Sequence, residues 1–93
     1  MKTLKVKVKL FSDANKALPS LLYGYRPHLT VEGDDELLGV EFIEWNLTQL
    51  DCFGDAVIRL LYDGVNYSKL KQNTEFCIVE GGRKTVGVGK VVE

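Results

Sequence analysis

The stretch VEGGRKTVGVGK, Val79–Lys90, decides how the fold of this chain is interpreted. It holds four glycines and three basic residues, so it is either a phosphate-gripping loop or the turn and return strand of a β-hairpin. The phosphate-loop motif G-x-x-x-x-G-K-[ST] fails, because Lys84 stands in place of its first glycine and Val91 in place of its hydroxyl residue. The dinucleotide motif G-x-G-x-x-G fails as well, and a Val-rich stretch follows where both motifs need a helix. The pattern therefore predicts a hairpin and no nucleotide site.

The glycines of this stretch have two structural roles. Gly81 and Gly82 are expected to turn the hairpin, since glycine adopts a positive φ at little cost. Gly87 and Gly89 lie two residues apart, on one face of the return strand. We expect either that a neighbouring backbone packs closely against them or that a bulge bends the strand there.

Outward from the hairpin, the chain is a series of short strand patterns. Near the N-terminus, Leu4, Val6, Val8 and Leu10 alternate with lysines, which is the period of a strand buried on one side. Further strands are expected in YRPHLTVE (25–32), LLGVEFIEW (37–45), AVIRLLY (56–62), TEFCIV (74–79) and KTVGVGKVV (84–92). The third of these six strands should be irregular near Ile43, where strict alternation fails.

Six short strands in 93 residues predict one all-β domain over residues 1–93, a small closed six-stranded antiparallel barrel of Greek-key-like topology. Helix is expected, if anywhere, as one short turn within 12–23 or 66–71. Trp45 and Phe53 are interpreted as core or barrel-plug residues rather than exposed anchors.

Composition limits the function classes. The chain is 45% hydrophobic and 27% charged, and it has neither a signal-peptide pattern nor an apolar run of membrane-spanning length, so we expect a cytoplasmic protein with no membrane partner. Two cysteines, Cys52 and Cys77, and one histidine, His28, do not form a metal-ligand or nucleophile motif. We therefore expect no enzyme, no metal and no cofactor.

Charge is segregated along the chain. Residues 32–55 hold eight acids and no Lys or Arg, whereas the remaining residues hold five acids and all twelve basic residues. With a net charge of −1, the chain lacks the basic excess of a dedicated nucleic-acid binder.

Three motifs, in order, carry a resemblance that covers about Leu4 to Val92. GYRP at 24–27, FGD at 53–55 before an apolar strand, and EGGRKTVGVG at 80–89 resemble the C-terminal (third) β-barrel domain of bacterial translation elongation factor Tu. That family has G-Y-R-P, P-G-D and R-E-G-G-R-T-V-G-A-G at these places, so Lys84 is one extra residue and Val79 replaces an arginine. The resemblance implies the same six-stranded barrel.

The resemblance also bears on function. Residues 1–93 have no counterpart of the elongation factor's GTP-binding domain or second barrel, so we expect no GTP hydrolysis. In that family the T-stem of aminoacyl-tRNA contacts the third domain near the E-G-G hairpin and near an R-T-T-D-x-T-G segment. Here VEGDDELLG (31–39) stands in place of that segment and carries four acids, which repel a phosphate backbone.

Two functions follow as hypotheses. The first is a non-catalytic protein-interaction module, linked to translation or imitating the elongation factor's domain. The alternative is an RNA- or tRNA-binding module that retains part of the T-stem-binding surface. In either case the candidate binding residues lie at the strand entrance and the last hairpin: Tyr25, Arg26, Glu80, Gly81, Gly82, Arg83 and Lys84. The competing interpretation is structural, with Tyr25, Arg26 and Arg83 holding the barrel shut through stacking and hydrogen bonds.

Overall fold

The computed structural model describes residues 2–13, 24–31, 36–62, 64–81 and 84–92. Within them the chain forms six strands. Their bounds are β1 Thr3–Leu10, β2 His28–Val31, β3 Leu38–Asn46, β4 Gly54–Leu60, β5 Glu75–Glu80 and β6 Lys84–Val91.

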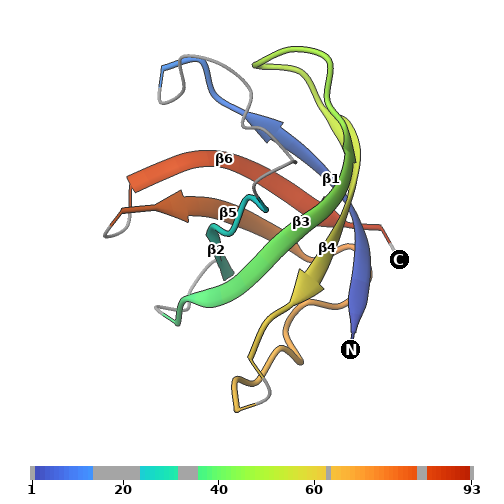
Figure 1. Cartoon of the computed structure of the whole chain (residues 1–93), viewed down its shortest axis with the longest axis vertical. Coiled ribbons are helices and arrows are strands. Elements are labelled where there is room, and N and C mark those ends of the chain that lie inside the picture. Colours follow the sequence, from blue (N-terminus) through green and yellow to red (C-terminus); the bar gives the residue numbers. More distant parts are fainter. Residues whose placement is uncertain (1, 14–23, 32–35, 63, 82–83, 93) are drawn as a thin grey trace.

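The strands close into an antiparallel barrel in the order β1-β4-β3-β2-β5-β6, with β6 pairing back onto β1 (Figure 1). Strands β2, β3 and β4 follow one another as neighbours, and β1, which the long connection 11–27 joins to β2, lies beside β4. This is the Greek-key arrangement with its long connection at the start of the chain. The predicted fold class is confirmed.

One face of every strand fills the interior of the barrel. On β1 the expected alternation holds, because Val6, Val8 and Leu10 are fully buried while the intervening lysines face outward. The buried apolar residues of the other strands complete a single cluster: Leu29, Leu38, Val40, Phe42, Ala56, Ile58, Phe76, Ile78, Val86 and Val91. Burial of this cluster is the main favourable term in the stability of the fold.

Two strands carry an extra residue. On β3, Phe42 pairs with Ile58 and Glu44 with Val57, so Ile43 is unpaired, as the sequence predicted. On β6 the irregularity lies opposite Ile78 and Val79 and leaves Val86 as the extra residue. Lys84 itself pairs regularly with Glu80. The resemblance placed the one extra residue of the hairpin at Lys84, but in the structure it is accommodated two positions later, at Val86.

Gly87 and Gly89 allow β6 to approach β1. A Cβ at Gly87 would collide with the backbone oxygen of Lys9, and one at Gly89 would lie 2.8 Å from the backbone oxygen of Lys7 and 2.5 Å from the Phe76 ring. Close backbone packing, one of the two expected roles, is therefore confirmed. The bulge at Val86 adjoins Gly87, so the second expected role, a bulge that bends the strand, also applies to β6.

The connections between strands complete the description. Residues 66–71 form turns instead of the short helical turn considered for them, and most of 12–23 lies outside the described residues. Leu70 reaches the core from this link, and the Leu70 N–H donates to the Tyr67 carbonyl at 2.9 Å. In the described part of the chain, no helix has the length and apolar character needed to cross a membrane.

The glycine contacts generate a prediction about barrel closure. Gly87→Ala should lower the free energy of unfolding by about 1–3 kcal/mol, because the added methyl group has no space against β1. Thermal and urea unfolding measure this loss. Gly64→Ala is the matched control, since a Cβ there meets nothing within 4 Å. Equal stability of the two variants would contradict the proposed role of Gly87.

Candidate functional site

The candidate site begins at the strand entrance, residues 24–27. Its backbone continues the pairing of β2 with β3, because the Phe42 N–H donates to the Tyr25 carbonyl at 2.9 Å and the Val40 N–H donates to the Pro27 carbonyl at 3.2 Å. Pro27 has no N–H to donate, and the pairing with β3 at this position uses only the Pro27 carbonyl. The segment is thus fixed against β3 before β2 begins at His28.

Tyr25 connects this entrance to the last hairpin. Its hydroxyl donates to the Glu80 carboxylate, 55 residues away in the sequence, and its ring packs against Phe42 and Trp45 with centroid separations of 5.4 and 5.8 Å. Burial raises the pKa of the Tyr25 phenol, and the hydrogen bond to Glu80 and its negative charge raise it further. The structure therefore brings together two of the three segments that the sequence singled out.

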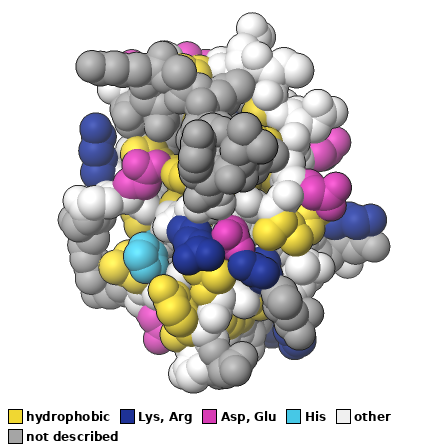
Figure 2. Space-filling view, in the orientation of Figure 1, with side chains coloured by type: hydrophobic (Ala, Val, Ile, Leu, Met, Phe, Trp, Pro, Cys, Tyr) yellow, Lys and Arg dark blue, Asp and Glu magenta, His cyan; other side chains and the backbone are white. Residues whose placement is uncertain are grey.

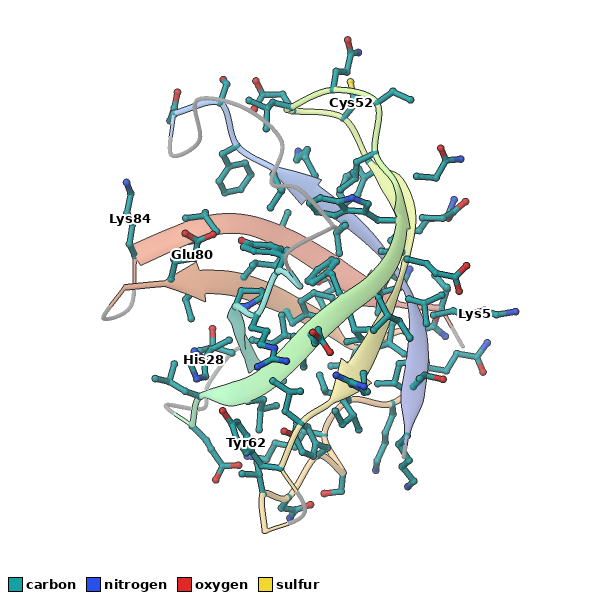
Figure 3. The ribbon with its side chains drawn as sticks, viewed as in Figure 1. Lys5, His28, Cys52, Tyr62, Glu80 and Lys84 are labelled. Atoms are coloured by element: carbon teal, nitrogen blue, oxygen red, sulfur yellow. The ribbon has the colours of Figure 1, made fainter. Side chains whose placement is uncertain are left out.

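The last hairpin turns at Gly81 and exposes the Lys84 side chain to solvent. Gly81 has a φ of +46°, in the region that favours glycine, as expected for the turn. Lys84 is exposed and extends from the tip of the barrel next to Glu80 (Figure 3). Gly82 and Arg83, the other two predicted residues of this hairpin, lie outside the described residues.

Arg26 belongs to a charge cluster that the sequence did not reveal. The Arg26 Nε donates to Glu41 Oε2 at 3.1 Å, and Arg59 Nη2 donates to the other oxygen of the same carboxylate. The Glu41 side chain is only 10% exposed, whereas Arg26 is 62% and Arg59 29% exposed. Figure 2 shows basic side chains on both sides of an acidic one on this face, with His28 beside them.

Local backbone geometry makes room for the carboxylate. Gly24 has a φ of +65°, and a Cβ there would lie 2.5 Å from Glu41 Oε2. The glycine of GYRP thus leaves space for the Glu41 carboxylate and also permits the positive φ at this position. One signal in the sequence could have identified the cluster: Arg59 interrupts an apolar strand, and β3, the preceding strand of the hairpin, carries Glu41 directly opposite it.

The two aromatic residues that were assigned to the core differ. Trp45 is partly buried and packs against the core, as expected. Phe53 is 58% exposed, so its assignment to the core was wrong. It precedes β4 at the rim of the barrel, where Lys9 Nζ lies 5.0 Å from its ring centroid and its side chain cannot reach the interior.

Among the hollows that described residues line, two are well defined. One of about 960 Å³ opens at the end of the barrel and is lined by Lys2, Leu4, Arg59, Tyr62 and Tyr67, among others. The other, of about 390 Å³, lies over Lys5, Val57 and Val92 on the outer face. Neither of these two hollows is lined by Tyr25 or Lys84.

The remaining chemistry-bearing residues are dispersed. Cys52 is exposed and Cys77 half-buried, and both are free thiols. Gln49 Nε2 donates to the Cys52 sulfur at 2.9 Å. Over the ranges that the structure describes, no three residues of the metal-ligating types lie close enough together to hold an ion.

Comparison with protein-family models finds no match for this chain, and comparison with curated proteins finds none either. The resemblance to the elongation factor's third domain therefore rests on the three motifs alone. The barrel agrees with the fold that the resemblance implied, but a six-stranded barrel is shared by proteins of unrelated function.

The Tyr25 geometry yields a prediction about ionisation. The pKa of the Tyr25 phenol is raised in the folded protein. The stability that the protonated phenol contributes is therefore complete below the usual tyrosine pKa of about 10, and it is lost as the pH rises through the folded pKa. In an ultraviolet absorbance titration of folded protein, wild type and Tyr25→Phe should show equal phenolate signals up to about pH 11. In denaturant, the phenolate signal of wild type should exceed that of Tyr25→Phe by the contribution of one tyrosine.

Tyr25→Phe should also cost about 1–2 kcal/mol of stability at neutral pH, since a hydrogen bond to a carboxylate is lost. A folded wild-type protein that shows nearly one more phenolate than the variant at about pH 11 would contradict the assigned environment of Tyr25.

Proposed function

We propose that this domain is a non-catalytic binding module that recognises a protein partner through the surface around the Tyr25–Glu80 bond. The observation that carries the proposal is this bond itself, which fixes the strand entrance to the last hairpin. Arg26 and Lys84 are exposed on the two joined segments. Because rigid elements hold them, little ordering entropy is lost when a partner binds.

The chemistry of the surface favours binding over catalysis. The raised pKa of Tyr25 keeps its phenol protonated at neutral pH, and its proton is engaged by Glu80, so it is a poor general base. Glu41 is saturated by two guanidinium groups. Tyrosine and arginine are, by contrast, the side chains that most often dominate the energetics of protein interfaces.

A protein partner is favoured over RNA by the acidic composition of the stretch that contains β3. Strand β3 lies within the acid-rich stretch 32–55, and Glu44 is exposed on it. A polyphosphate backbone that followed this face would meet these carboxylates and lose the attraction on which RNA affinity depends. The three motifs that resemble the elongation factor extend the proposal. The partner is then a component of the translation apparatus, and this chain imitates the elongation factor's barrel toward it.

Affinity capture from cell extract tests the proposal. The bait is the full chain as wild type, as Arg26→Ala/Lys84→Ala, and as the charge-matched control Lys7→Ala/Lys71→Ala, whose lysines are exposed outside the two segments. We expect wild type and control to retain the same protein at about 0.1 and 0.5 M salt, and the first variant to retain at least about tenfold less. Thermal unfolding should place both variants within about 1 kcal/mol of wild type.

The other outcomes have distinct meanings. Retention of RNA that disappears at the higher salt concentration would support the alternative, an RNA-binding module. Equal retention of the protein by both double variants would place the interface elsewhere on the barrel.

A further inference from the structure

The hollow of about 960 Å³ at the end of the barrel is built from three segments that are far apart in the sequence. They are the start of β1, the end of β4 with the residues that follow it, and the link 65–70. Tyr62, on its lining, lies at the lower end of the barrel in Figure 3, away from Lys84 and Glu80. The volume lies within the range of about 300–1,000 Å³ that is typical of small-molecule sites.

Hydrogen bonds hold the walls of this hollow in place. The Tyr67 hydroxyl donates to the Gly39 carbonyl at 2.6 Å and accepts from the Tyr62 N–H at 3.2 Å. The Leu60 N–H donates to the Lys2 carbonyl at 3.0 Å. The link and the start of β1 are thus both tied to the sheet, so little ordering entropy is lost when a ligand enters.

The hollow offers aliphatic and aromatic contacts to the body of a ligand. Leu4, Leu61 and Val65 are half-buried side chains on its lining. The Tyr62 ring packs against the backbone of Gly39, where a Cβ would collide with it, and Tyr62 is nevertheless 53% exposed. A ligand with an apolar body would therefore remove apolar surface of its own and of these side chains from water.

The polar groups of the hollow favour an anion. Lys2 is exposed, and within the part of the chain that the structure describes its ammonium forms no ion pair. Asn66 Oδ1 accepts from the Ser68 N–H at 3.0 Å, which leaves Asn66 Nδ2 as a donor. Arg59 also lines the hollow, but its guanidinium bonds to Glu41, so the charge available to a ligand is that of Lys2. No described residue of the lining is acidic.

We infer that this hollow binds a small organic monoanion, a carboxylate attached to an aromatic or aliphatic body, with the carboxylate at Lys2 and the body against Tyr62. The ammonium neutralises the carboxylate, and the phenol ring and its aliphatic neighbours cover the body. An exposed ion pair contributes little by itself, so the apolar body supplies most of the affinity and the charge supplies selectivity. The site is independent of the surface proposed for the protein partner.

Three probes separate the charge from the apolar body. The isotope-labelled full chain is titrated at pH 7 and constant ionic strength with phenylacetate, with the neutral phenylacetamide and with acetate, and the backbone amide signals of Leu61, Tyr62 and Ser68 are followed by NMR. Phenylacetate should give saturable shifts. Phenylacetamide should bind about threefold more weakly, because it lacks the charge. Acetate should bind at least about tenfold more weakly, because it has no body to bury.

Three variants assign the contacts. Lys2→Gln should weaken phenylacetate binding about threefold and leave phenylacetamide binding unchanged, since only the charged probe uses the ammonium. Tyr62→Ala should weaken the binding of both probes at least about threefold. Lys90→Gln, which removes an exposed charge on β6 outside the hollow, is the matched control and should alter neither. Because all three residues are exposed, the folded spectra should be retained.

Each contrary result overturns a stated part of the inference. No saturable shift with phenylacetate overturns it entirely. Equal binding of phenylacetate and acetate removes the role of the apolar body, and equal binding of phenylacetate and phenylacetamide removes the preference for an anion. Unchanged phenylacetate binding in Lys2→Gln removes Lys2 as the partner of the carboxylate. None of these results affects capture of a protein through Arg26 and Lys84, so failure here is distinguishable from failure of the proposed function.

Discussion

The close approach of β6 to β1 is the constraint on which the rest of the barrel depends. Two neighbouring strands can approach this closely only where one of them lacks side chains. Gly87 and Gly89 are the positions without side chains, and they lie against the backbone of Lys9 and Lys7. Closure removes the last open sheet edge. It also allows the Phe76 ring to lie over Gly89 inside the barrel, so the same glycines shape the core.

Once the barrel is closed, the entrance and the hairpin are held in place by polar contacts at its periphery. Tyr25 reaches Glu80 across the β2–β5 side, and Arg26 reaches Glu41 across the β2–β3 side. Both bonds come from adjacent residues of one short segment whose carbonyls already pair with β3. The segment therefore combines the half-buried Tyr25, whose hydroxyl bonds to Glu80, with the exposed Arg26, whose Nε bonds to Glu41.

The parts of this structure that the sequence predicted are those governed by local periodicity. The strand of Val6 and Val8, the irregularity at Ile43 and the turn at Gly81 each depend on a few consecutive residues. The Glu41 cluster depends on the pairing register of β3 and β4 and on the path of residues 24–27, which no short stretch encodes.

Phe53 was misplaced for a related reason. An aromatic residue at a turn has no periodicity to indicate its side, and here it lies one residue before β4, where the chain has not yet entered the sheet. The long connection to β2 lies mostly outside the described residues, so it adds nothing to this comparison.

The packing of Trp45 against Tyr25 has a spectroscopic consequence. The chain contains a single tryptophan, and its ring lies 5.8 Å from the Tyr25 ring and 5.4 Å from that of Phe42. Indole emission depends on the polarity and mobility of the surroundings, so separation of the entrance from β3 would change it. The protein thus contains an intrinsic fluorophore beside its candidate recognition surface, and occupancy of that surface can be followed in the native chain without a label.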